Sequence, residues 1–136
     1  MVQIVGKYEH EKSEGFEEYL RTVSGGEQAD KAATFAKSKP VLDVQESGDE
    51  FVITVTNEGK STTSTFKLGV PYDETMPHGV TMKSVTTRDG DTFTTETELP
   101  GGNKSVRVYE FLDDGITVHL SDSKTGAKAT RYYKRF

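Results

Sequence analysis

Apolar and polar residues alternate along most of the chain after Pro40, with the two-residue period of strands that bury one face. Phe51, Ile53 and Val55, for example, occupy alternate positions of one such segment. Gly-containing turn signals separate the segments at about ten-residue intervals, as in an antiparallel sheet. We therefore predict eight or nine strands after Pro40, with the clearest over residues 41–45, 51–55, 61–68, 80–87, 92–99, 104–112, 116–121 and 127–136.

The N-terminal part of the chain has a different pattern. Residues 4–12 alternate loosely and predict a first strand. A helix is expected next, with Ser13 as its N-cap. A second, Ala-rich helix is expected over residues 27–37, ended by Lys39-Pro40. The first helix has a one-faced apolar stripe, formed by Phe16, Tyr19, Leu20 and Val23.

The composition favours a single domain over residues 1–136 whose core is not fully apolar. Leu, Ile, Val and Phe supply 29 of the 136 residues, which is low for a packed domain. A small closed antiparallel β-barrel with a polar outer face and a partly wet, ligand-holding interior reconciles this count with the regular alternation.

Charge and motifs exclude several functions. The net charge of −5 argues against nucleic acid as a partner, and the chain contains no Cys. We expect a soluble, cytoplasmic monomer, because neither a signal peptide nor a membrane span is apparent. The three histidines are scattered, with His119 on the polar register of its strand, and acidic residues gather at predicted hairpin tips. We therefore expect no catalysis, no cofactor and no metal site.

A series of short motifs resembles the intracellular lipid-binding proteins, specifically the fatty-acid-binding proteins and their invertebrate members. The motifs follow one another in the family's order over nearly the full chain. They are Gly6-Lys7-Tyr8, residues 14–20, Lys39-Pro40, Phe66 to Gly69, Tyr72 to Glu74, Lys83-Ser84, Asp89-Gly90 and Arg131 to Lys134.

The resemblance implies a ten-stranded up-and-down barrel, with a two-helix lid between the first and second strands, that carries a long-chain fatty acid. It implies that Arg131 and Tyr133 grip the carboxylate inside. Two residues apart on one strand, these side chains share a face. Arg offers a planar fork that matches a carboxylate, and Tyr adds a hydroxyl donor. The alternative from pattern alone is an exposed Arg on a final edge strand.

Two positions depart from the family pattern. Tyr109 stands where the family often has a second internal Arg, and Arg107 lies two residues earlier on the same face. Either of them is a candidate for the headgroup network. Gly59 stands where many members carry a Phe at the portal, so Phe16 or Phe35 of the lid is expected to fill that role.

The acyl chain is expected to contact apolar side chains of the lid and of the inner strand faces. Some of these side chains are expected to pack the barrel bottom with Tyr8 instead, and periodicity does not separate the two groups. The candidates are Phe16, Tyr19, Leu20, Phe35, Phe51, Ile53, Val55, Phe66, Leu68, Met82, Phe93, Phe111, Val118 and Leu120.

The leading hypothesis is a carrier that binds one or more fatty acids and hands them to membranes through the lid, where Lys31 and Lys37 meet anionic lipid. Three alternatives stay open. They are a retinoid carrier of the same fold, an interaction or storage protein with a vestigial pocket, and a lipocalin-type isomerase, which would lack a base in the cavity.

Overall fold

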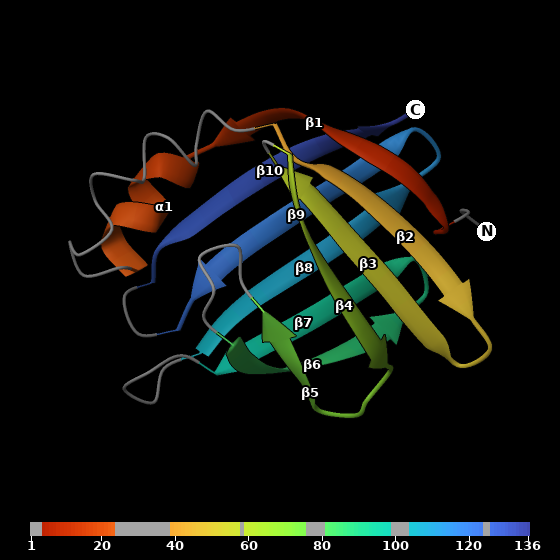
Figure 1. Ribbon diagram of the computed structural model, residues 1–136. Coiled ribbons are helices and arrows are strands. Elements are labelled where there is room, and N and C mark those ends of the chain that lie inside the picture. Colours follow the sequence, from red (N-terminus) through yellow and green to blue (C-terminus); the bar gives the residue numbers. More distant parts are fainter. Residues whose placement is uncertain (1–3, 24–38, 58, 76–80, 99–103, 124–125) are drawn as a thin grey trace.

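The computed structural model describes residues 4–23, 39–57, 59–75, 81–98, 104–123 and 126–136. The described part holds ten strands and one helix (Figure 1). In chain order they are β1 (Gly6–Glu14), α1 (Phe16–Val23), β2 (Val41–Ser47), β3 (Glu50–Asn57), β4 (Lys60–Lys67), β5 (Tyr72–Thr75), β6 (Thr81–Asp89), β7 (Thr92–Glu98), β8 (Lys104–Leu112), β9 (Gly115–Asp122) and β10 (Lys128–Arg135).

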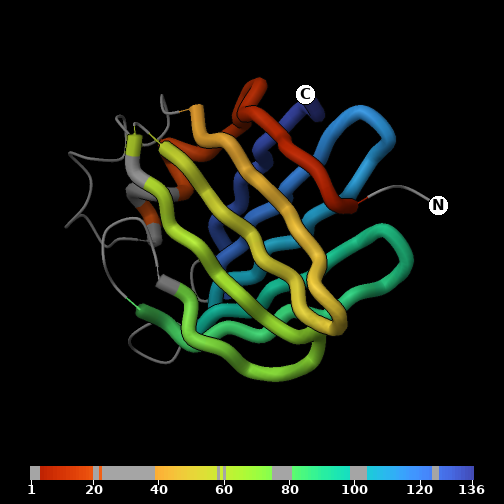
Figure 2. The backbone as a smooth tube through the Cα atoms, turned by 45° about the vertical axis from the view of Figure 1, so that its right-hand side comes forward, coloured from red at the N-terminus to blue at the C-terminus, as the bar shows by residue number. Residues whose placement is uncertain are grey.

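The ten strands form one antiparallel sheet that curls into a nearly closed barrel. Its order is β4-β3-β2-β1-β10-β9-β8-β7-β6-β5, so neighbours in space are neighbours in sequence except where β1 meets β10. The strands of the two halves cross, and α1 lies at one end of the barrel (Figures 1 and 2). The start of β1 and the end of β10 lie at the opposite end (Figure 1). The predicted up-and-down barrel is confirmed.

The barrel is not fully closed by backbone pairing. In the described residues, the ladder contains no pairing between β4 and β5, the two ends of the strand order. Instead, Gly69 N donates to Thr86 O on β6 at 2.8 Å, and the rings of Phe66 and Tyr72 stack with centroids 5.1 Å apart. One backbone hydrogen bond and a stacked pair of rings therefore bridge the interval that the strand ladder leaves open.

A β-bulge in β1 sets the direction of a side chain needed later. His10 pairs with Tyr133 and Lys12 with Tyr132, so the register shifts between His10 and Lys12. Beyond the shift, Ser13 pairs with Arg131. Because a bulge inserts one residue into the alternation, His10 and Ser13 face the same side although they are three residues apart.

Helix α1 begins later than the sequence predicts. The prediction of Ser13 as N-cap is wrong, because β1 continues through Glu14 and Ser13 belongs to its ladder with β10. Gly15 makes the break, with a φ of 67° that favours glycine, and its carbonyl accepts from Tyr19 N at 2.9 Å. Phe16 and Tyr19 are buried against Ala129, which confirms one side of the predicted stripe.

Some predictions lie outside the described residues. They concern the second helix, over residues 27–37, with Phe35, Lys31 and Lys37, and the side chains of Leu20 and Val23. The short strand β5 was not among the predicted segments, because Pro71 and two acidic residues interrupt the apolar alternation there. Among the described helices, none is long and apolar enough to span a membrane.

An aromatic cluster fills the barrel near the start of β1. Tyr8 is fully buried and meets Phe111 edge to face, and Phe93 contacts Phe111, Phe51 and Phe66 with centroid separations of 5.1–6.4 Å. Such aromatic pairs contribute beyond their buried area. The predicted packing of some aromatic side chains around Tyr8 is confirmed, and Phe93, 1 % exposed, lies at its centre.

The substitution Phe93→Ala tests the role of this cluster. Because the ring is almost fully buried among three other rings, its removal leaves a cavity that the rigid neighbours cannot fill. We expect the free energy of unfolding to fall by about 3–5 kcal/mol in a chemical denaturation experiment. Val70→Ala, at an exposed position, is the control and should stay within about 0.5 kcal/mol of the parent protein.

Candidate functional site

Three rows of inward side chains cross the adjacent strands β8, β9 and β10. Strand pairing sets the rows, since residues directly opposite one another share a face. The row nearest the aromatic cluster is Phe111, Ile116 and Tyr133; the middle row is Tyr109, Val118 and Arg131; the row nearest α1 is Arg107, Leu120 and Ala129. Adjacent strands lie close to 5 Å apart, so the backbones of Tyr109 and Arg131 are about 10 Å apart across β9.

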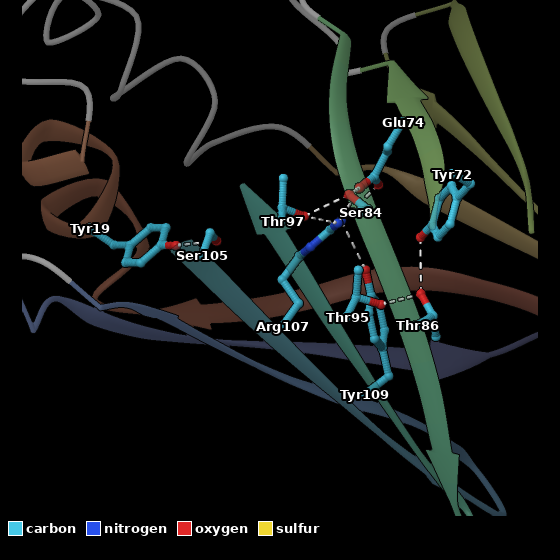
Figure 3. A network of polar contacts seen from close by, with 10 residues as sticks. All are labelled: Tyr19, Tyr72, Glu74, Ser84, Thr86, Thr95, Thr97, Ser105, Arg107 and Tyr109. Atoms are coloured by element: carbon cyan, nitrogen blue, oxygen red, sulfur yellow. Dashed lines mark hydrogen bonds and ion pairs between the residues drawn. The ribbon is translucent and has the colours of Figure 1, made fainter. Parts of the chain in front are cut away.

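Arg107 lies in a compact polar group formed by four strands (Figure 3). Its Nη1 donates to Glu74 Oε2 at 2.9 Å and to Tyr109 Oη at 3.2 Å. Its Nη2 donates to Thr97 Oγ1 at 3.1 Å and to Glu74 Oε1. Ser84 Oγ donates to the same Glu74 Oε1 at 2.8 Å. The side chains of Arg107 and Glu74 are only 17 % and 13 % exposed, so this ion pair is largely shielded from solvent.

The two partners of this pair hold each other in the charged state. Burial by itself raises the pKa of the Glu74 carboxyl, but the charge and hydrogen bonds of Arg107 outweigh it and lower that pKa overall. Burial also opposes the charge of Arg107, yet Tyr109 and Glu74 raise its pKa. Arg107 and Glu74 therefore form a unit with no net charge.

Hydroxyl groups extend this polar group along the inner face of β5, β6 and β7. Thr86 Oγ1 lies 3.0 Å from Tyr72 Oη and 2.8 Å from Thr95 Oγ1 (Figure 3). Ser84 Oγ lies 2.8 Å from Thr97 Oγ1. Burial raises the pKa of Tyr72 to about 12, so its hydroxyl stays protonated. One wall of the interior is thus lined with oxygen atoms.

Arg131 lies on the inner face of β10, opposite that wall. It is 9 % exposed, and its Nε donates to Ser13 Oγ at 3.0 Å, a contact that the bulge in β1 makes possible. Its guanidinium carbon lies 4.0 Å from the centroid of the Phe16 ring, a cation–π distance. Burial lowers the pKa of Arg131, in contrast to Arg107. The interior therefore stabilises the charge of Arg131 less well than water does.

Tyr133 and His10 complete the surroundings of Arg131. Burial raises the pKa of Tyr133 to about 12, with Arg131, Tyr109 and Arg107 all close enough to influence it. His10 meets Tyr133 edge to face at 5.6 Å, and its Nε2 lies 2.7 Å from Ser13 Oγ. Burial, and then the charge of Arg131, lower the pKa of His10, which keeps its ring neutral near pH 7.

The four residues predicted for the headgroup, Arg107, Tyr109, Arg131 and Tyr133, therefore lie together, and their binding role stays a prediction.

The candidates for the acyl chain fall into two groups. Phe51, Phe66, Phe93 and Phe111 belong to the buried aromatic cluster. Ile53, Val55, Met82 and Leu120 are partly buried on the inner strand faces, together with the buried Val118, and the partly buried Leu68 follows the end of β4. Gly59 is exposed, and His119 is exposed with its Nε2 in contact with Glu110 Oε1, as its register indicated.

Several residues of this site were not predicted from the sequence. Glu74 had one available signal, because it follows Tyr72 by two residues and therefore shares its face. The shared inward orientation of Ser13 and His10 depends on the bulge in β1, which no residue pattern in the sequence predicts. The inward hydroxyls on β6 and β7 occupy alternate positions of Thr-rich strands. Because the outward positions of these strands are polar as well, the sequence does not show which face is buried.

The sequence was compared with family models and with individual curated proteins. No family model matches the chain. A curated fatty acid-binding protein of Lepidoglyphus destructor is 34 % identical over 136 residues, covering 99 % of both chains. The chain belongs to the fatty-acid-binding protein family. Fatty acid-binding protein 2 of Manduca sexta, another relative, is 32 % identical over 125 residues and covers 90 % of this chain.

Solved structures of the family have the same fold. The fatty acid-binding protein from brain tissue of Drosophila melanogaster superposes with a TM-score of 0.83 at 32 % identity, covering 97 % of this chain and 99 % of that one. The protein isolated from Manduca sexta gives a TM-score of 0.85 at 30 % identity with the same coverage. A Schistosoma mansoni protein in complex with arachidonic acid, at 22 % identity, shares the fold with a TM-score of 0.86.

In this family member, the Glu74–Arg107 pair makes stability depend on pH in a defined direction. A carboxyl with a lowered pKa in the folded state contributes its stability above the unfolded-state value, about 4.3, and loses it as the pH falls through the folded-state value. At pH 7 we expect Glu74→Gln to lower the free energy of unfolding by about 1–3 kcal/mol.

The gap between parent and variant should close in urea titrations carried out at progressively lower pH, below about 4. Glu96→Gln, which removes an exposed carboxylate on β7, should track the parent protein throughout. A gap for Glu74→Gln that is constant between neutral and acidic pH would contradict a charged carboxylate at this position.

Proposed function

We propose that this protein is a carrier of long-chain fatty acids, which binds the carboxylate inside the barrel at Arg131 and Tyr133. The observation that carries the proposal is the position of Arg131, 9 % exposed and on the inner face of β10. The family relatives are named for fatty acids, which fits this assignment.

Electrostatics favours Arg131 over Arg107 as the cation for the headgroup. A buried guanidinium loses its hydration, and a carboxylate brought beside it restores the lost stabilisation of its charge. Arg131, whose pKa is lowered by burial, stands to gain from such a ligand. Arg107 already has Glu74 as its carboxylate. The hydroxyl of Tyr133 is protonated at neutral pH and serves as an added donor to the bound oxygen.

The acyl chain binds to the apolar part of the inner face. Ile53, Val55 and Met82 are partly buried there. Leu120 packs against both the aromatic cluster and the buried group of Phe16, Tyr19 and Ala129. Each methylene buried contributes about 0.8 kcal/mol, so the chain supplies most of the affinity and the headgroup sets the orientation. Phe16 and Tyr19 extend this surface toward α1.

Delivery completes the proposal. The protein works in the cytoplasm as a monomer, takes no part in catalysis, and transfers its ligand at membranes through the helical end of the barrel. The net charge of −5 makes this contact weak and brief, because anionic lipid repels an acidic surface.

A retinoid carrier is the second candidate, since retinoic acid also presents a carboxylate. Displacement of a bound fluorescent fatty acid by oleate or by retinoic acid separates the two candidates.

The substitution Arg131→Gln tests the carboxylate site. We expect palmitate binding, measured by calorimetry on delipidated protein, to weaken by about 10-fold to 100-fold, the effect of one charge-assisted contact. Binding of the neutral analogue hexadecanol should change little. Arg88→Gln, at an exposed arginine that donates to Gly90 O, is the matched control. Equal affinities of parent and Arg131→Gln for palmitate would refute the proposed site, and no uptake by the parent would favour a vestigial pocket.

A second substitution, Tyr133→Phe, removes the hydroxyl and leaves the buried ring in place. Because one uncharged donor is lost, we expect palmitate affinity to fall by about 2-fold to 10-fold. Tyr132→Phe is the control on the same strand, since Tyr132 faces the other side of the sheet, where its ring lies 4.8 Å from Lys12 Nζ. A loss for Tyr132→Phe that equals the loss for Tyr133→Phe would contradict the assignment.

A further inference from the structure

The two terminal nitrogens of Arg107 are fully occupied within its polar group. Its two terminal nitrogens carry four N–H groups, and these four donate to Glu74 twice, to Tyr109 and to Thr97. Glu74 is satisfied as well, because Oε1 accepts from Ser84 and Arg107 and Oε2 accepts from Arg107. An incoming acid headgroup therefore meets a closed pair of charges at this place.

Tyr109 receives its orientation from the same pair. Arg107 Nη1 donates to Tyr109 Oη at 3.2 Å, so the hydroxyl proton of Tyr109 is directed away from Arg107. Tyr109 shares its row across β9 with Arg131. Where the family often places a second cation, this chain presents a neutral hydroxyl donor level with its headgroup arginine.

The charge facing a bound headgroup follows from this arrangement. Arg107 and Glu74 cancel within their ion pair, so of the two inner arginines only Arg131 is not already paired with Glu74. Two further charged residues of the described chain reach the interior. Arg135, half-buried, donates to Val5 O and Tyr8 Oη beside the aromatic cluster. Asp122 is buried on β9 opposite Ser105 of β8, one row beyond Arg107 and Leu120, and its negative charge adds to the repulsion of a second anion.

We propose that Glu74, by occupying Arg107, makes the interior selective for headgroups with one negative charge and excludes headgroups with two. The proposal rests on the carboxylate site at Arg131 proposed above. A second negative charge would find neutral hydroxyl groups and the Glu74 carboxylate, which repels it. Specificity of this kind comes from an element that disfavours the wrong ligand as much as from contacts with the right one. Glu74 is a positioning residue, because it acts through Arg107.

Two ligands of the same shape separate charge from size. Hexadecyl sulfate carries one charge at any working pH, whereas hexadecyl phosphate is mostly a dianion at about pH 8, since the second pKa of a phosphate monoester is about 6. The quantity to measure, by calorimetry on delipidated protein, is the ratio of the two dissociation constants, phosphate over sulfate. A general loss of structure moves both constants together and leaves the ratio unchanged.

For the parent protein we expect the phosphate to bind at least about 10-fold more weakly than the sulfate. In Glu74→Gln, Arg107 becomes available to an anion, and the ratio should fall by about 10-fold or more. Glu96→Gln, on the exposed side of β7, is the matched control and should keep the parent ratio. An unchanged ratio in Glu74→Gln overturns the proposal.

Arg107→Gln tests the same idea from the opposite side, and decides the matter if Glu74→Gln does not fold. It makes no cation available at this place, and burial then favours a protonated Glu74, so the ratio should stay at or above the parent value, with hexadecanol binding unaltered. A ratio that falls about 10-fold or more below that of the parent overturns the proposal. Palmitate binding by the parent protein, with its loss in Arg131→Gln, reports on the carrier site separately, so either idea can fail alone.

Discussion

A positive charge inside a barrel is stabilised by a negative partner, and two arginines of this protein, Arg107 and Arg131, lie on the inner face. Desolvation of a guanidinium costs several kcal/mol, which a well-placed carboxylate offsets. Arg107 has its partner within the fold, in Glu74 on β5. Arg131, on β10, is the cation that we assign to the ligand. The difference between a carboxylate that belongs to the fold and one that comes with a ligand is the basis on which we assign different roles to these two arginines.

The architecture places these charges through simple features of strands. Alternation brings Arg131 and Tyr133 to one face, and register aligns Tyr109 with Arg131 across β9. The bulge in β1 turns Ser13 inward, where it accepts a hydrogen bond from Arg131. Below them, the aromatic cluster around Phe93 gives a rigid end to the barrel. The polar residues therefore act on a frame that packing, rather than charge, holds together.

Much of this arrangement could be predicted from the sequence. Alternating residues and Gly turns are local signals, and they located eight of the nine strands after α1. Strand β5 was not predicted because its residues are mostly polar, and Glu74, the partner of Arg107, was therefore not predicted as a site residue. The bulge that moves Ser13 from a supposed helix cap to the inner face is fixed by pairing with β10, a contact across more than a hundred residues. Long-range pairing is information that periodicity does not contain.

The central claim is that a bound fatty acid is ionised and paired with a buried cation. NMR of palmitate labelled with carbon-13 at its carboxyl, followed while the complex is titrated with acid, measures this directly. The account predicts that the bound carboxyl resonance stays at its ionised position well below about pH 4, where an ordinary carboxyl is half protonated, and that Arg131→Gln abolishes this resistance. A bound carboxyl that titrates like one in water would contradict it.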